Sequence, residues 1–286
     1  MITLCSTDAV LAATQQARSV ALTAYVMRPG RVLTALEEAA KRGVRVTVRL
    51  EASPFGDTNG DLHRENVEAV RALHASGADA HVVDGDGRRP LHLKAALVDN
   101  ELFLDDRNWP DDGRDTIIRD TDPRDIRTFT EAIAGTPQND APLATVKDAA
   151  LQREANVIYR AAKALQPVDV QSESFGFGRI YAALKTLAQK HVPVRLLVAE
   201  RDLNANCASA LQHLMAQGVT VRLSESDEKM AVARDTGWIG SANATMGIEN
   251  QIDWGLDIFD RSVIANMHER FEENWAAAKP YAPGAT

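Results

Sequence analysis

Two hydrophobic patterns alternate along the chain, one with the period of a helix and one with the period of a strand. Residues 30–53, GRVLTALEEAAKRGVRVTVRLEAS, carry apolar side chains at helical spacing up to a glycine, and then alternate valine or leucine with polar residues. Residues 69–83, AVRALHASGADAHVV, follow the same order. Residues 1–22 predict a strand followed by a capped helix. Such alternation predicts an α/β fold in which helices cover a sheet.

The same patterns occur a second time in the chain. Residues 178–201, GRIYAALKTLAQKHVPVRLLVAER, resemble residues 30–53. Residues 210–224, ALQHLMAQGVTVRLS, resemble residues 69–83 in the same way. Self-similarity in the same order indicates one structural unit used twice.

A third pair of segments completes the repeat. HLKAALVDNELFLDDRNW at 92–109 aligns without gaps to DEKMAVARDTGWIGSANA at 227–244. We therefore expect two similar halves, residues 1–135 and 136–286, joined through the polar, proline-containing segment 134–144. Two such halves pack most easily about a pseudo-two-fold axis, which would bring equivalent motifs face to face.

Composition narrows the class of protein. The chain has 286 residues, of which 45% are apolar, and this is enough for a substantial core. Its net charge of −8 argues against broad binding of nucleic acid or anionic lipid. Cys5 and Cys207 follow no metal-ligand spacing and fit two unpaired thiols in a reducing compartment. Since neither a signal peptide nor an apolar run of about 20 residues is found, we expect a cytoplasmic protein without a membrane span.

The segment 92–109 carries the candidate chemistry of the first half. Its apolar runs predict a hairpin with the turn at Asp99, and the alternation of a strand places His92 and Lys94 on one face. A neutral imidazole can attack phosphorus, and a fixed ammonium can stabilise charge on the phosphoryl oxygens. Asn108, after the second strand, can add an amide donor. This combination predicts a site for an anionic phosphoryl group.

The second half keeps only part of this set. Lys229 and Asn243 stand at the positions of the first motif's lysine and asparagine, and Asn243 ends the turn G-S-A-N at 240–243. Asp227, however, stands where the first half has His92. No cluster of His, Asp or Cys has metal-ligand spacing, and no nucleotide-binding glycine loop is present, so we expect neither a metal nor a cofactor.

H-x-K-x-x-x-x-D followed by G-S-x-N resembles the signature of the phospholipase D superfamily, with one intact and one degenerate copy here. The resemblance spans nearly the whole chain. It implies two pseudo-symmetric α-β-α sandwich halves with the site between them. It also implies metal-independent phosphodiester cleavage or transfer through a phosphohistidine.

Carried over by position, His92 would be the nucleophile. Asp115 or Asp253 would orient it, although the family usually has glutamate at these positions. The phosphate-binding set would be Lys94, Asn108, Lys229, Ser241 and Asn243. The second histidine of the family has no counterpart in this chain.

Two carboxyl groups depart from the family pattern. Asp227 replaces the second histidine, and it either serves as a general acid with a raised pKa or has lost that role. Asp106 stands where the second half has Ser241. If ionised about 4 Å from a phosphate, Asp106 would oppose binding by roughly 4 kcal/mol at an effective dielectric near 20. It therefore points outward, donates a proton as an acid, or indicates a site that no longer binds phosphodiesters.

Three functions remain open on the sequence. The first is a phospholipase D-like phosphodiesterase or phosphatidyl or phosphoryl transferase, with a small phosphodiester or a lipid headgroup as substrate. The second is a catalytically degenerate phosphate-binding or regulatory protein on the same fold. The third is a nuclease-like member, which the acidic charge and the lack of an aromatic-basic stripe disfavour. We expect a functional monomer, because a covalent second half occupies the face that single-motif members use to dimerise.

Overall fold

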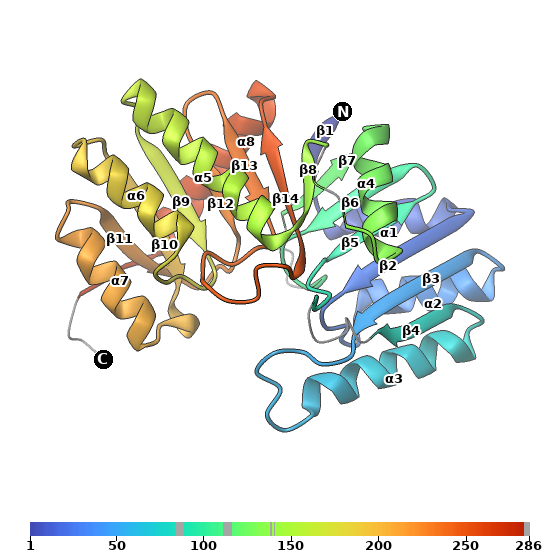
Figure 1. Ribbon diagram of the computed structural model, residues 1–286. Helices are drawn as coiled ribbons and strands as arrows, with labels where there is room; N and C mark the ends of the chain where they lie inside the picture. Colours follow the sequence, from blue (N-terminus) through green and yellow to red (C-terminus); the bar gives the residue numbers. More distant parts are fainter. Residues whose placement is uncertain (84–88, 111–115, 138, 140, 283–286) are drawn as a thin grey trace. The chain divides into compact units, whose positions relative to one another are not determined.

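The computed structural model describes residues 1–83, 89–110, 116–137, 139 and 141–282 (Figure 1). The chain packs into two compact units. The first consists of Met1–Lys147 with Asn250–Trp254, and the second of Asp148–Glu249 with Gly255–Thr286. Strand β14 (Ile252–Ile258) thus begins in the first unit and ends in the second. The boundary that the sequence places at residue 135 stays a prediction about the repeat.

Within the described ranges, the first unit contains a seven-stranded sheet in the order β1-β7-β6-β5-β2-β3-β4. Parallel pairing joins β2 to β3 and β3 to β4, and the other neighbours are antiparallel. The strands are β1 (Ile2–Cys5), β2 (Ser19–Ala24), β3 (Arg45–Glu51), β4 (Asp79–Val83), β5 (Ala95–Val98), β6 (Glu101–Asp105) and β7 (Ile117–Asp120). The helices are α1 (Thr7–Gln16), α2 (Arg31–Lys41), α3 (Asp61–Ala75) and α4 (Pro123–Ile133), and strand β8 (Leu143–Val146) follows.

The second unit repeats this topology. Its strands run in the order β15-β11-β10-β9-β12-β13-β14, and β8 of the first unit borders β14, whose first residues belong to that unit too. The strands are β9 (Val168–Ser172), β10 (Val194–Ala199), β11 (Thr220–Ser224), β12 (Met230–Val232), β13 (Gly237–Gly240) and β15 (Lys279–Pro280). The helices are α5 (Lys147–Ala164), α6 (Arg179–Gln189), η1 (Glu200–Asp202), α7 (Ala205–Met215) and α8 (Arg261–Ala277). The order β7-β6-β5-β2-β3-β4 corresponds to β14-β13-β12-β9-β10-β11, so the expectation of two similar α/β halves is confirmed.

Local sequence explains why the repeated helices end where they do. After α2, Gly43 has φ 85°, and after α6 the matching residue His191 has φ 57°. This left-handed conformation lets the next N–H return to the helix, where Val44 donates to the Ala39 carbonyl at 3.1 Å. Glycine adopts it without steric cost, whereas histidine does so at some strain. The chain then enters a parallel strand in both units.

Asp99 has a structural role at the turn between β5 and β6. Its φ is 51°, and its Oδ1 accepts hydrogen bonds from the N–H of Arg18 at 3.1 Å and of Ser19 at 2.9 Å. These bonds tie the hairpin to the start of β2, the strand with which β5 pairs. The aspartate of the H-x-K-x-x-x-x-D motif therefore holds the fold in place.

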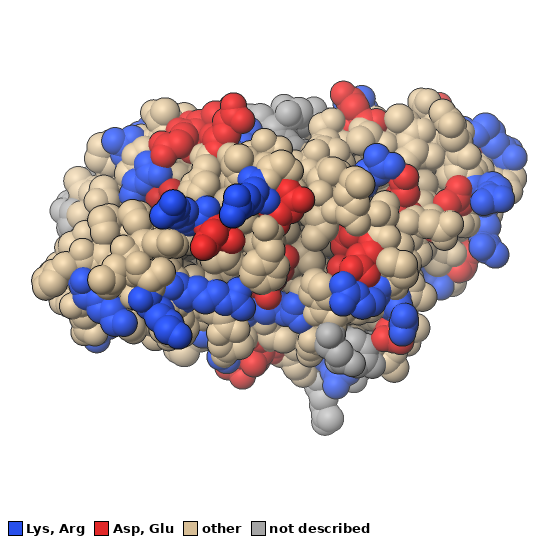
Figure 2. Space-filling model, turned by 90° about the horizontal axis from the view of Figure 1, so that it is seen from above, with Lys and Arg blue, Asp and Glu red and all other residues tan. Residues whose placement is uncertain are grey.

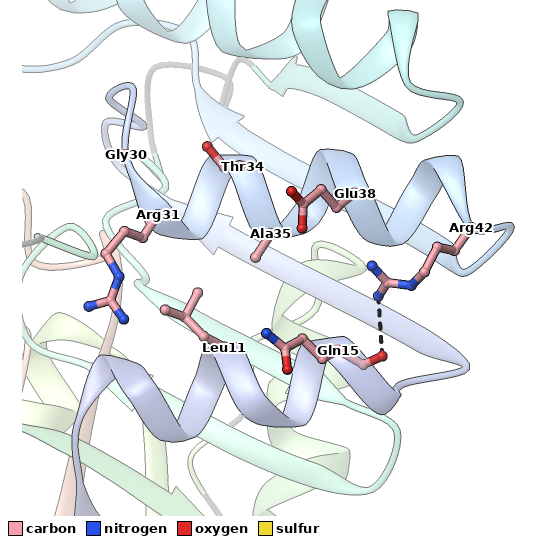
Figure 3. A pocket seen from close by; sticks show the side chains of 8 residues that line it. All are labelled: Leu11, Gln15, Gly30, Arg31, Thr34, Ala35, Glu38 and Arg42. Atoms are coloured by element: carbon pink, nitrogen blue, oxygen red, sulfur yellow. Dashed lines mark hydrogen bonds between the residues drawn. The ribbon is translucent and has the colours of Figure 1, made fainter.

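One face of the molecule carries mixed charges, and one pocket lies away from the motif residues. On the face in Figure 2, lysine and arginine are interspersed with aspartate and glutamate. A pocket of about 540 Å³ lies between α1 and α2, with Leu11 and Gln15 on one side and Glu38 and Arg42 on the other (Figure 3). The Arg42 Nη2 donates to the Gln15 carbonyl at 3.3 Å. None of the residues that line this pocket belongs to either motif.

No helix in the described part of the chain combines the length and the apolar character needed to cross a membrane.

Candidate functional site

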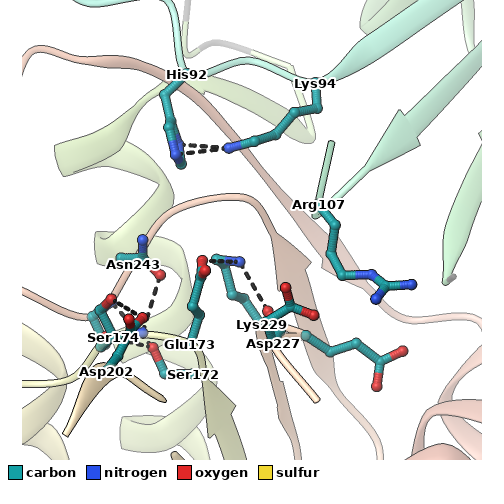
Figure 4. A network of polar contacts seen from close by, with 12 residues as sticks. His92, Lys94, Arg107, Ser172, Glu173, Ser174, Asp202, Asp227, Lys229 and Asn243 are labelled. Carbon is teal, nitrogen blue, oxygen red and sulfur yellow. Dashed lines mark hydrogen bonds and ion pairs between the residues drawn. The ribbon is translucent and has the colours of Figure 1, made fainter. Parts of the chain in front are cut away.

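The first motif lies where the chain enters β5. The side chain of His92 is 12% exposed, and Lys94 is almost fully buried. The Lys94 Nζ lies 2.9 Å from His92 Nδ1 and 2.8 Å from Nε2 (Figure 4). The alternation of the strand therefore brings the imidazole and the ammonium together, as their spacing in the sequence indicates.

A carboxylate from a distant part of the sequence contacts the same imidazole. Asp253 Oδ1 lies 3.1 Å from His92 Nδ1, and the Asp253 side chain is 1% exposed. Two backbone bonds fix this register within the first unit. The His92 N–H donates to the Ile252 carbonyl at 2.8 Å, and the Ile252 N–H donates to the Pro90 carbonyl at 2.9 Å. A buried carboxylate on Nδ1 favours the tautomer in which Nε2 carries the lone pair.

Tyr25, the residue directly after β2, borders both motif side chains. Its ring meets the His92 ring edge-on with the centroids 4.7 Å apart, and Lys94 Nζ lies 5.6 Å from the Tyr25 centroid. The Tyr25 hydroxyl oxygen accepts a hydrogen bond from the Phe55 N–H, and burial raises the pKa of Tyr25 to about 12. The phenol is therefore neutral, and its ring packs against the imidazole of His92. Sequence reasoning missed Tyr25, although its place at the end of a central strand was a usable signal.

The loop after β6 is shaped by Asp105. The Asp105 carboxylate accepts hydrogen bonds from the N–H of Arg107 at 3.0 Å and of Trp109 at 2.6 Å, and burial raises the pKa of Asp105. Asp106 beside it is fully buried, so it does not point into solvent. Its role as an acid stays a prediction. Asp115 lies outside the described residues.

The second motif has an internal network of charges. Lys229 is 2% exposed, and its Nζ lies 2.9 Å from Glu173 Oε2. The same Nζ donates to the Asp227 main-chain carbonyl at 2.9 Å. The Arg201 Nη2 contacts Glu173 Oε1 at 2.5 Å and Asp227 Oδ2 at 2.7 Å. Both carboxylates thus form ion pairs with cations of their own unit. Figure 4 shows the contact between Glu173 and Lys229.

The asparagines that end the two motifs accept equivalent hydrogen bonds from the main chain. Asn108 Oδ1 accepts from the Val26 N–H at 3.1 Å, and Asn243 Oδ1 accepts from the Ser174 N–H at 3.3 Å. Each amide uses its oxygen to hold the loop after a central strand, so a phosphate contact would fall to its NH₂ group. Ser241, the remaining residue of the expected phosphate-binding set, is fully buried in the second unit.

Metal ligands do not gather at either motif. Among the residues whose positions are described, no three His, Cys, Asp or Glu side chains lie together in a way that could hold a metal ion.

A family model matches part of the chain, and solved structures share its fold. Residues 157–275 match the family described as cardiolipin synthase, PLD-like domain. They include the degenerate motif, and the other half carries the intact motif on the same strand order. Residues 157–275 thus match a PLD-like domain, and the strand order of the other half is that of a second such domain. No curated protein sequence matches this chain.

Two solved structures share the phospholipase D-like fold of the whole chain. Phosphatidylserine synthase from Haemophilus influenzae Rd KW20 matches with a TM-score of 0.72 at 10% identity, over 98% of this chain and 87% of the synthase. Polyphosphate kinase from Porphyromonas gingivalis matches with a TM-score of 0.70 at 15% identity, over 96% of this chain. The chain spans only 47% of the length of the kinase. At these identities the likeness establishes the fold alone.

Proposed function

We propose that this phospholipase D-like chain is a phosphodiester hydrolase or phosphoryl transferase with His92 as the nucleophile. The observation that carries the proposal is the contact of 3.1 Å between His92 Nδ1 and the buried Asp253 carboxylate. Because this contact favours a lone pair on Nε2, that nitrogen attacks phosphorus. The N–P bond forms while the bond from phosphorus to the leaving oxygen breaks. Water or an alcohol then attacks the phosphohistidine and returns Nε2 to its starting state.

Lys94 and Tyr25 support this step. Without substrate, the Lys94 ammonium lies 2.8 Å from the attacking nitrogen. A phosphoryl oxygen is a stronger acceptor for an ammonium than a neutral imidazole is, so substrate binding draws the ammonium away from Nε2. The edge-on ring of Tyr25 restrains the imidazole as this exchange takes place.

Asp227 would complete the reaction as the acid in place of the second histidine. Its ion pair with Arg201 at 2.7 Å requires the ionised carboxylate, which cannot donate a proton. Donation from Asp227 would first require this pair to open. The proposal therefore favours substrates whose leaving group departs as a stable anion, since such departure needs no acid.

A second candidate is a phosphate-binding or regulatory protein without turnover. The contact of 2.9 Å between Lys229 and Glu173 favours it, because the cation of the second motif already has an anionic partner. For the nuclease-like alternative we find no supporting observation. The mixed charges in Figure 2 and the net charge of −8 continue to disfavour it.

The test is turnover and covalent trapping in the full chain. Chromogenic phosphodiesters with lipid-headgroup and nucleotide portions would be assayed with the wild type, with His92→Ala and with His74→Ala, an exposed histidine of α3. We expect turnover and a phosphohistidine adduct in the wild type and in His74→Ala, and neither in His92→Ala. Phosphate binding without turnover or adduct, over the whole substrate set, would instead support the phosphate-binding protein.

A further inference from the structure

The two units place different residues at one equivalent position beside the motif lysine. Strand β2 ends one residue before Tyr25, and strand β9 ends one residue before Glu173. Each strand pairs in parallel with the next strand of its unit. The residue that follows, Val26 or Ser174, donates its N–H to the asparagine of its own motif. Tyr25 and Glu173 are therefore structural counterparts.

These counterparts give the two lysines opposite electrostatic surroundings. Tyr25 presents a neutral ring to Lys94, with the ring centroid 5.6 Å from Nζ, and so brings no opposite charge to it. Glu173 presents a carboxylate oxygen to Lys229 at 2.9 Å. Its other oxygen lies 2.5 Å from Arg201, so Glu173 bridges two cations.

We propose that Glu173 is a specificity-determining residue of the second motif, a built-in anion that an oxyanion ligand must displace to reach Lys229. The proposal rests on the proposed function only in taking Lys229 as a phosphate ligand. Lys229 is 2% and Glu173 is 22% exposed at the side chain, so solvent screens their attraction weakly. A phosphate that approaches Lys229 meets the repulsion of this carboxylate. Glu173 thereby favours ligands of low negative charge at Lys229.

The experiment measures the binding of inorganic phosphate by calorimetry, at constant ionic strength set with sodium chloride. All variants are full chains that carry His92→Ala, so that binding is measured without turnover. We expect Glu173→Gln to bind phosphate at least about tenfold more tightly than the parent, because one repelling charge is removed. Adding Lys229→Met should abolish this gain. In the first unit, Tyr25→Glu should have the opposite effect and weaken phosphate binding.

A thermal measurement keeps the proposal testable where Glu173→Gln is unstable. A ligand that binds the folded state raises Tm with its concentration, so Glu173→Gln and Glu173→Tyr should gain more Tm from phosphate than the parent does. Equal affinity, or an equal rise of Tm, would overturn the role of Glu173 and leave the proposed nucleophile untouched. Tighter phosphate binding in Glu173→Gln, together with no turnover in the chain that retains His92, would support the role of Glu173 while counting against the enzyme.

Discussion

Lys94 and Lys229 occupy the same position in the two units, but their neighbours differ in charge. Lys94 lies beside the imidazole of His92 and the neutral phenol of Tyr25, whereas Lys229 lies beside the carboxylate of Glu173. In the first unit the nearby carboxylate, Asp253, contacts the imidazole instead. The same strand order can thus place a motif lysine beside two rings or beside a carboxylate. The difference depends on the residues at two positions, Tyr25 or Glu173 and His92 or Asp227.

The largest expected effect comes from removing the proposed nucleophile. His92→Ala should lower kcat by more than about 10⁴-fold, because the covalent path is lost. Asp227→His, which restores the family's second histidine, should retain or increase activity. Steady-state kinetics with one chromogenic diester checks both variants. If His92→Ala and Asp227→Ala lowered kcat equally, the two motifs would be equivalent in the reaction and the comparison would fail.

Asp253→Asn should have the next largest effect. The amide keeps the shape of the carboxylate, but its NH₂ group favours the wrong tautomer of His92, so kcat should fall by about 10²–10⁴-fold. KM should change little, since Asp253 Oδ1 contacts the imidazole of His92. Asp257→Asn, in the second unit and on the same strand, is the matched control and should leave kcat near the wild-type value. A larger effect on KM than on kcat would contradict a role in orienting His92.

The two lysines should respond unequally to the same substitution. In the proposed function Lys94→Met removes a cation that binds the phosphate of the substrate, so kcat/KM should fall by about 10²–10³-fold. Lys229→Met removes a cation that Glu173 already engages, so we expect a loss of about tenfold or less. Phosphate inhibition constants measured beside kcat/KM would separate binding from chemistry. Equal losses for both lysines would show that Glu173 does not neutralise the second motif.

The repeat and the contacts within short segments could be predicted from the sequence. The match of 30–53 to 178–201 predicted α2 and α6, because the helical periodicity of apolar residues is a local property. The contact between His92 and Lys94 followed from the period of a strand. Asp253 lies 161 residues from His92. The family resemblance offered Asp115 or Asp253 as the partner of His92, whereas periodicity could not, because only the fold brings such distant residues together.

Glu173 and Arg201 could not be found by motif reasoning for a related reason. Both lie outside the motif segment 227–244, and their significance depends on ion pairs formed by side chains from separate strands and loops. The repeat contained a signal for Glu173, because the alignment at a constant offset pairs it with Tyr25. An acidic residue in place of an aromatic one adds a negative charge near the motif lysine, and this difference can be read from the sequence.

The two units also differ at a second pair of equivalent positions, where the first unit has buried carboxyl groups and the second has apolar side chains. In the first unit Asp120 ends β7 and Asp125 lies in the first turn of α4, and both are buried. The corresponding residues before and within α8 are Ile258 and Val263, which are buried and apolar. Asp125 Oδ1 accepts the Leu143 N–H at 2.8 Å. Burial, reinforced by the neighbouring Asp120, raises the pKa of Asp125 to about 7.

The raised pKa of Asp125 determines how stability changes with pH, which is the smallest effect that we predict. In the folded chain Asp125 keeps its proton up to about pH 7, whereas in the unfolded chain it loses the proton near its ordinary value of 3.8. The folded state thus binds more protons between these values, and the contribution of Asp125 to stability falls as pH rises from about 4 to 7.

Asp125→Asn keeps an oxygen for the Leu143 N–H and removes the titration. We expect this variant to flatten the decline of Tm between pH 5 and 8 by on the order of 2–4 °C. Asp122→Asn, at a carboxyl whose pKa Arg124 holds at about 2, should leave the slope in that range unchanged. If Tm declined with pH equally in Asp125→Asn and in the wild type, Asp125 would not be the source of the decline. The two units would then not differ in pH sensitivity at this position.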